Sequence, residues 1–299
     1  MIWNLLRGLA VAMLPVYTCA QDLAINKEEM QLHDAVSAFE MPQEDPPVAM
    51  PGGIYKLNWK YDAPVTAVGA AWSLYAFTQI YNKPSTPVAE IEALDKNDIN
   101  AFDRWAAGNS NDAADDNSDF IFYGAMPYPL VLLADKEIRK DAPKIGFLYL
   151  EAMAFTGLFY TGSTYFTNRF RPEAYNTDIP AADRTNGGMR NSFLAGHVAL
   201  VATSTFFTAK VYNDYHPGST WSYVLWGTAA AATGTTIYLR HIAGKHFPTD
   251  IIVGTALGVG SGILVPHLHK NKVKGNQALN ISPFMGENTY GLTLRSNIR

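Results

Sequence analysis

The chain has 299 residues, of which 48% are hydrophobic, enough apolar side chains for one large buried core. Its 23 basic and 27 acidic residues give a formal net charge of −4, which excludes the strong positive field of a typical nucleic-acid-binding protein. The single cysteine, Cys19, excludes an intramolecular disulfide and a cysteine-rich zinc site. We therefore expect one compact unit that has no nucleic acid partner.

The sequence begins with features of an export signal. Residues 1–20 have a weakly positive start, an apolar middle and small residues at Thr18 and Ala20, which predicts a signal peptide cleaved after Ala20. Lipidation of Cys19 is the alternative, but the residues before it match the lipoprotein pattern poorly. In either case we expect the mature protein outside the cytoplasm.

A proline-rich stretch without periodicity covers residues 21–63, and we expect a surface lead-in there. The main domain is expected over residues 64–270, which contain six apolar segments rich in Ala, Gly, Thr and aromatic residues. These segments are 65–81, 120–134, 146–163, 197–212, 221–239 and 251–268. They predict an all-α bundle with about six core helices, either membrane-spanning or a soluble or peripheral bundle.

Two further regions differ from the apolar segments. Residues 82–118 are polar and acidic, which is typical of a solvated connection, and their spacing does not fit a calcium-binding loop. The tail, residues 271–299, has the turn Gly286-Glu287-Asn288 between two short alternating stretches and predicts a small β-hairpin.

Residues whose side chains can bind phosphate or take part in catalysis lie between the last two apolar segments. Arg240 offers a planar guanidinium that suits a phosphate, and His246 can attack a phosphorus atom or relay a proton. Asp250 follows His246 by four residues, close enough in sequence to hold its ring. Together they predict one half of a phosphate site.

The other half is expected between residues 164 and 197, the other place where cations and an imidazole lie beside apolar segments. Gly196 and His197 stand at the start of an apolar helix, whose unpaired backbone N–H groups and positive end would face a bound anion. The cations of this stretch include Arg169, Arg171 and Arg190.

These stretches resemble the three signature motifs of the type 2 phosphatidic acid phosphatase and vanadium haloperoxidase superfamily. The motifs are Lys, six residues, Arg-Pro; then Pro-Ser-Gly-His; then Ser-Arg, five residues, His, three residues, Asp. The matching residues here are Arg171-Pro172, Gly196-His197, and Arg240 with His246 and Asp250. The placement of the motifs among the apolar segments extends the similarity over residues 65–268.

The resemblance implies a phosphatase that needs no metal ion or other cofactor and works through a covalent phosphohistidine. Neutral His246 would attack the phosphorus atom, Asp250 would hold its ring, and His197 would protonate the leaving alcohol and then activate water. The phosphate oxygens would be bound by Arg171, Arg240 and the Gly196 backbone N–H. The implied substrate is a phosphate monoester or pyrophosphate of a bacterial envelope lipid. The protein would be membrane-associated with its site facing the periplasm, or periplasmic.

Three positions depart from the motifs. Thr164 replaces the lysine, Leu194-Ala195 replaces Pro-Ser, and Leu239 replaces the serine before the arginine. The missing lysine and serine remove two phosphate contacts, each worth about 1.5–3 kcal/mol as a charge-assisted hydrogen bond. Arg169 or Arg190 is expected to supply the missing positive charge.

These departures leave two alternatives open. One is a protein of the same fold that has lost turnover and binds phosphorylated lipids. The other is a vanadate-dependent haloperoxidase, against which the missing lysine argues.

The remaining histidines and Lys245 are interpreted as structural or surface residues. His33, His216 and His241 belong to this class. His267 and His269 lie beside several lysines, which favours a basic helix end over a metal site.

The membrane topology is also left open. If all six segments span a bilayer, the positive-inside rule places the motif loops outside. Counting spans from an exported, cleaved N-terminus places the same loops inside. The short segment 120–134, with Pro127 and Pro129, removes the conflict over the motif loops if it does not cross. The mean hydropathy of −0.05 also allows an exported bundle without spans.

Overall fold

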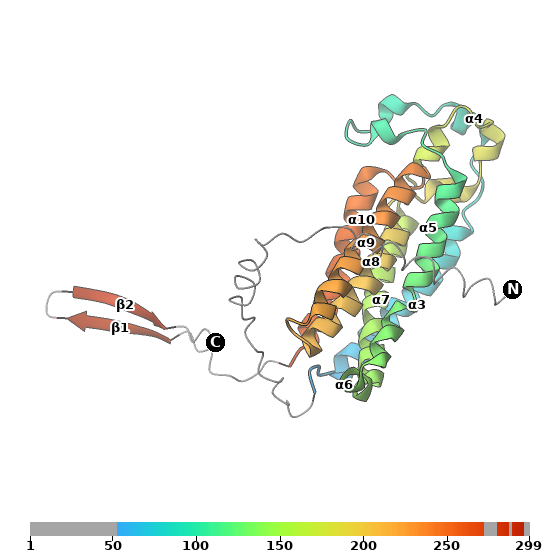
Figure 1. Ribbon diagram of the computed structural model, residues 1–299. Coiled ribbons are helices and arrows are strands. Elements are labelled where there is room, and N and C mark those ends of the chain that lie inside the picture. Colours follow the sequence, from blue (N-terminus) through green and yellow to red (C-terminus); the bar gives the residue numbers. More distant parts are fainter. Residues whose placement is uncertain (1–52, 272–279, 287–288, 296–299) are drawn as a thin grey trace, which may run out of the picture. The chain divides into compact units, whose positions relative to one another are not determined.

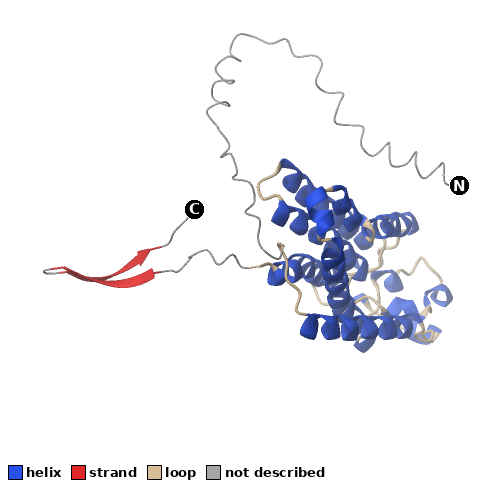
Figure 2. Cartoon of the chain, turned by 90° about the horizontal axis from the view of Figure 1, so that it is seen from below, coloured by secondary structure: helices blue, strands red, loops and turns tan. Residues whose placement is uncertain are grey.

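The computed structural model describes residues 53–271, 280–286 and 289–295. The predicted signal peptide, Cys19 and most of the predicted lead-in lie outside these ranges. Within them the chain forms a bundle of helices (Figure 1) and one two-stranded sheet (Figure 2).

Long helices lie side by side in the bundle (Figure 1). They are α3 (Trp59–Tyr81), α5 (Asp112–Ala125), α7 (Ala142–Phe166), α8 (Gly196–Tyr215), α9 (Thr220–Ile242) and α10 (Pro248–His269). Two short helices, α4 (Val88–Glu92) and α6 (Lys136–Lys140), and several 3₁₀ turns connect them. The prediction of an all-α bundle with about six core helices is confirmed for the described residues.

Helix α8 lies at the centre of the bundle. Most of its residues are buried, and α5, α7, α9 and α10 all pack against it. A helix that is covered on every side needs no polar face, which explains why its sequence is apolar and small-residue-rich without amphipathic periodicity.

A stripe of glycines brings α10 into close contact with α8. A Cβ atom would lie 2.7 Å from the Ala195 carbonyl oxygen at Gly254, 2.2 Å from that of Ala199 at Gly258, and 2.6 Å from that of Thr203 at Gly262. Only glycine permits this approach of two helix backbones. The stripe therefore holds the start of α10 against the start of α8, where the two histidine motifs lie.

The structure divides the predicted segment 120–134. Helix α5 ends at Ala125, and a 3₁₀ helix follows from Tyr128 to Ala134, because the prolines at 127 and 129 cannot continue α-helical hydrogen bonding. Helix α5 also begins earlier than expected, within the acidic stretch predicted to be a solvated connection. The Asn111 side chain accepts a hydrogen bond from the Ala114 N–H (2.9 Å), which caps this helix start.

The predicted tail hairpin is present. Strand β1 (Asn280–Gly286) pairs antiparallel with β2 (Thr289–Arg295), with Gly286 opposite Thr289. The other two residues of the predicted turn, Glu287 and Asn288, lie outside the described residues.

The bundle exposes many large apolar side chains. Examples are Val68 and Leu74 on α3, Trp221 and Tyr238 on α9, and Leu268 on α10, each more than half exposed. Among the described helices, α10 is the one that is long and apolar enough to cross a membrane, judged by length and composition. Exposed apolar surface of this extent is typical of proteins that contact a membrane or another protein.

Candidate active site

The three motif stretches meet at one end of the bundle. Helices α7 and α9 end there, while α8 and α10 begin. Backbone hydrogen bonds join the connecting loops: the Glu173 N–H donates to the Gly244 carbonyl (3.0 Å), and the Ala195 N–H donates to the Asp250 carbonyl (3.2 Å). The fold thereby brings together residues that are as much as 79 positions apart, from Arg171 to Asp250.

His246 is buried, and its Nδ1 lies 2.6 Å from the Ser192 carbonyl oxygen. A carbonyl oxygen only accepts hydrogen bonds, so Nδ1 carries the hydrogen and Nε2 of the neutral ring keeps its lone pair. Burial, together with the positive charges of Arg240 and Arg171, lowers the pKa of His246 well below its usual value. The ring is therefore a neutral imidazole with Nε2 available as a nucleophile.

Asp250 lies close to His246 but is connected to it differently from the direct contact that the sequence predicts. Its carboxylate accepts hydrogen bonds from the Ser192 hydroxyl (2.6 Å) and the Phe247 N–H (2.9 Å). The Phe247 bond caps the start of α10, and this local capping geometry turns the carboxylate toward the helix end. Ser192 thus links the two residues, because its carbonyl holds the His246 ring and its hydroxyl holds Asp250.

His197 lies in the first turn of α8. Its Nε2 is 3.0 Å from an Asp119 carboxylate oxygen, and its ring packs 4.5 Å from that of Phe122. Burial and the charges of Arg240 and Arg171 lower the pKa of His197 to about 3. In the free protein His197 is therefore neutral near pH 7.

Gly196, beside it, is required by packing. A Cβ atom at this position would lie 2.4 Å from the Tyr160 ring of α7. The absence of a side chain lets α7 approach the start of α8, whose first backbone N–H groups have no partner within the helix.

Three cations lie near the histidines: the charges of Arg171 and Arg240 act on both rings, and that of Lys245 acts on His197. Arg240, at the end of α9, donates to Asp115 (2.5 Å) and to the Ser118 hydroxyl (3.1 Å). The Nε atoms of both arginines are buried without a hydrogen-bond partner among the described residues. Unsatisfied buried donors are costly, so this cluster keeps unused capacity to bind an anion.

Lys245, interpreted from the sequence as a bystander, belongs to this cluster. Its ammonium lies 2.7 Å from Glu173 and 3.1 Å from Asp115, and its side chain is 13% exposed. Its charge contributes to the lowered pKa of His197. Lys245 is thus a partly buried cation directly before His246 in the sequence.

Two carboxylates of α5 also face the cluster, and sequence reasoning missed them. Asp115 and Asp119 lie four residues apart, on one face of the helix, and both are within 4 Å of the Arg240 guanidinium. Burial alone would raise the pKa of Asp115, but the charges of Arg240 and Lys245 outweigh it and hold that pKa below its usual range. The i, i+4 spacing after the capping Asn111 is the signal that could have revealed this face.

The departures from the motifs also have structural explanations. The Thr164 hydroxyl donates to the carbonyl oxygens of Tyr160 and Phe193, both at 2.9 Å. Lys83 donates to the carbonyl oxygens of Thr164 and Thr167, also at 2.9 Å, and so caps the end of α7. Position 164 is therefore a packing position in this chain.

The two arginines expected to replace the missing lysine are engaged elsewhere. Arg169 is paired with Asp250 and with Asp103 (2.6 Å), and it lies over the Phe247 ring. Arg190 donates to the Pro84 carbonyl oxygen (2.6 Å). Neither Arg169 nor Arg190 lies beside Asp115 and Glu173 in the described site, whereas Lys245 contacts both carboxylates.

A cavity of about 540 Å³ lies next to this network. Polar and aromatic side chains line it, among them Asn100, Arg169 and Tyr175. Its lining contains neither His197 nor His246.

Comparison with known proteins identifies a family for part of the chain. Residues 145–274, which contain most of α7, all of α8 to α10 and most of the residues of the site, match the PAP2 superfamily. A lipid A 4′-phosphatase of Porphyromonas gingivalis is 31% identical over 103 residues, which are 33% of this chain and 40% of that protein. No solved structure matches the chain significantly. Residues 145–274 of this chain are therefore a PAP2 superfamily domain.

Proposed function

We propose that this chain is a phosphatase that hydrolyses a phosphate monoester or pyrophosphate of an envelope lipid through a phosphohistidine intermediate. The observation that carries the proposal is a neutral, buried His246 that lies, with His197, within the electrostatic influence of Arg171 and Arg240. The arginine Nε donors that lack partners in the described structure favour a bound anion at this place.

In the first step His246 Nε2 attacks the phosphorus atom, and the bond from phosphorus to the lipid oxygen breaks. His197 gives its proton to the departing oxygen, which leaves as an alcohol. Burial and the nearby arginine charges hold His197 deprotonated in the free protein. In this proposal the bound phosphate offsets the arginine charges, and His197 takes up a proton from solvent before the P–O bond breaks.

In the second step His197, now neutral, accepts a proton from water while the water oxygen attacks phosphorus. The P–N bond breaks, phosphate leaves and His246 returns to its neutral form. Asp250 acts through Ser192 to hold the His246 ring, and Arg169 in turn holds Asp250.

Arg171, Arg240 and the Gly196 backbone N–H bind the phosphate oxygens in this proposal, and Lys245 supplies the positive charge that Thr164 does not. Its place beside Asp115 and Glu173 supports this role. The chemistry uses no metal ion or other cofactor.

A lipid substrate is supported by two observations. The bundle exposes large apolar side chains on several helices, and the named relative acts on lipid A. We infer that the protein is membrane-associated in a bacterial envelope, exported by residues 1–20, with its site on the periplasmic side. The chain spans about 40% of the length of that relative, so its substrate is our proposal for this chain.

The test is a phosphate-release panel with purified full-length protein. Candidate substrates are a phosphatidate, a monophosphorylated lipid A and an isoprenyl pyrophosphate, each in detergent micelles with chelator present. We expect release from at least one lipid and inhibition by vanadate. Absence of release from every lipid, or release that vanadate leaves unchanged, would contradict the proposal.

A second candidate, a protein that binds phosphorylated lipids without turnover, is favoured by one feature. Asp115, Asp119 and Glu173 already neutralise the three cations, which weakens the pull on a phosphate. Lipid binding without phosphate release, at equal affinity in the parent and in His246→Gln, would support this candidate.

A further inference from the structure

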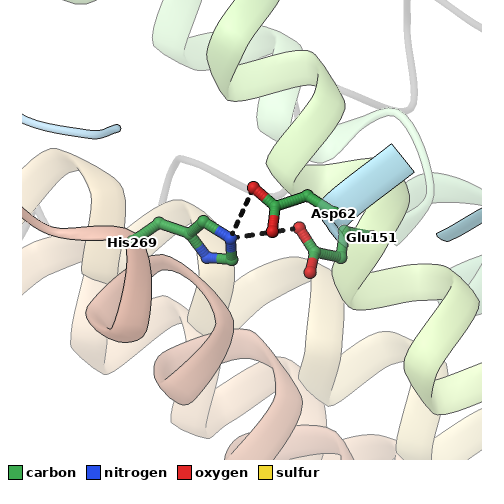
Figure 3. A group of neighbouring side chains, drawn as sticks. All are labelled: Asp62, Glu151 and His269. Carbon is green, nitrogen blue, oxygen red and sulfur yellow. Dashed lines mark ion pairs between the residues drawn. The ribbon is translucent and has the colours of Figure 1, made fainter. Parts of the chain in front are cut away.

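A second cluster, of partly buried side chains, lies at the opposite end of α10. Asp62 comes from the first turn of α3, Glu151 from α7, and His269 is the last residue of α10 (Figure 3). The His269 Nε2 atom lies 3.3 Å from an Asp62 oxygen and 3.5 Å from a Glu151 oxygen. Each of the three side chains is about 14% exposed.

The carboxylate oxygens of this cluster outnumber the hydrogen-bond donors that reach them. His269 Nδ1 lies 2.8 Å from the Val265 carbonyl oxygen, which only accepts, so Nδ1 carries a hydrogen and Nε2 faces the two carboxylates. The Glu151 Oε2 atom, which is the oxygen 3.5 Å from His269 Nε2, is buried and makes no hydrogen bond among the described residues. Asp62 receives one backbone hydrogen bond, from the Asn58 N–H (2.5 Å).

The charges do not balance either. Two carboxylates face one imidazole, which carries at most one positive charge. The nearest cation in the sequence, Lys270, instead binds Asp214 (2.7 Å). A divalent cation between the three side chains would neutralise both carboxylates and use the free lone pair of His269.

The distances fit such an ion. Zinc binds imidazole nitrogen and carboxylate oxygen at about 2.0–2.2 Å, so two ligands of a tetrahedral ion lie about 3.4 Å apart. The two distances from His269 Nε2 are close to this value, and the three ligand atoms lie within 4.8 Å of one another. The Val265 carbonyl fixes the ring as carbonyl partners of metal-bound histidines do.

We propose that Asp62, Glu151 and His269 bind one divalent transition-metal ion of the zinc class. The ion joins α3, α7 and α10 and stabilises the bundle. Helix α10 separates His269 from Asp250 by 19 residues, or about 28 Å along the axis, so the ion takes no part in phosphate chemistry. The proposal is independent of the proposed function.

The experiment uses full-length protein stripped with chelator, then supplied with one equivalent of Zn²⁺. We expect one bound zinc per chain by elemental analysis. The melting temperature Tm should rise by about 5 °C or more when the free zinc concentration exceeds the Kd a hundredfold. Absence of zinc uptake by folded parent protein, or uptake without a shift in Tm, would overturn the proposal.

Variants locate the ion. Glu151→Gln and His269→Gln keep side-chain volume and should lose zinc uptake and the Tm shift, while His267→Gln, an exposed histidine two residues away, should keep both. Uptake by the two cluster variants equal to that of the parent would refute the site. Circular dichroism before zinc addition checks that each variant folds. Co²⁺ bound to the parent in place of zinc should give a ligand-field spectrum typical of mixed nitrogen and oxygen ligation, and this measurement needs no variant.

Discussion

The two ends of α10 differ in the charge of the polar groups that lack a hydrogen-bond partner there. At its start, Arg171, Arg240 and Lys245 lie together, and two guanidinium Nε donors have no partner among the described residues. At its end, Asp62 and Glu151 face a single imidazole, and a carboxylate oxygen has no hydrogen-bond partner among those residues. Unused donors favour an anion and unused acceptors favour a cation, so one bundle carries two sites of opposite preference.

The largest effect is expected from removing a cation at the start of α10. Arg240→Met should lower kcat/KM about a thousandfold, because it removes a donor to the transition state and leaves the partly buried Asp115 with Lys245 as its remaining cationic partner. Phosphate-release kinetics measure the effect. Arg139→Met, which alters an exposed arginine, is the control and should match the parent.

Acid should destabilise the same end of the bundle. His197 has a pKa of about 3 in the fold and about 6.5 when unfolded, so between these values the unfolded chain binds the additional proton and stability falls as pH decreases. From pH 7 to pH 5 this histidine alone costs about 2 kcal/mol, with a further loss in the same direction from His246.

Denaturant unfolding at several pH values measures this loss. The variant His197→Asn should show a shallower pH dependence than the parent. An identical dependence in the two proteins would contradict the assigned shift.

Removal of a competing carboxylate should sharpen anion binding. Asp115→Asn frees Arg240 and Lys245 and should lower the inhibition constant of vanadate about tenfold at low ionic strength. Asp116→Asn makes the same charge change at an exposed neighbour and should have little effect. Weaker vanadate inhibition in Asp115→Asn would mean that this carboxylate holds the cations in place for binding.

The smallest effect is expected at Ser192. Ser192→Ala removes the hydroxyl that links Asp250 to the His246 segment, yet the backbone carbonyl still holds the ring and Asp250 keeps Phe247 and Arg169. We expect kcat to fall a few fold with KM unchanged, as for a positioning residue. A rise in KM with kcat unchanged would instead place Ser192 in substrate binding.

The sequence predicts the all-α fold because its long apolar segments have helical length and few charges. It also predicts the loops that converge, since Arg171, His197 and His246 each lie where an apolar segment begins or ends. The packing of α8 on α10 follows from the Gly254, Gly258 and Gly262 repeat, which only the structure connects to a partner helix.

What the sequence does not predict depends on contacts between distant segments. The sequence indicates that Asp115 and Asp119 are solvated and that Lys245 is exposed. In the structure Asp115 contacts Arg240, and Lys245 contacts Glu173. His269 ends α10 together with the basic His267, as the sequence indicates, but its contacts with Asp62 and Glu151 come from distant helices and are not visible in the sequence. Side-chain direction decides each of these cases, and local spacing does not encode it.

The most direct test of the central claim is the capture of a covalent phosphate on His246. The parent, mixed briefly with its lipid substrate and quenched in alkali, should carry phosphate on His246 by mass spectrometry. His246→Gln should carry none and should release phosphate at least a thousandfold more slowly, while His241→Gln, a control histidine that packs on Trp105, should resemble the parent. Phosphate release by His246→Gln at the parental rate would contradict the account.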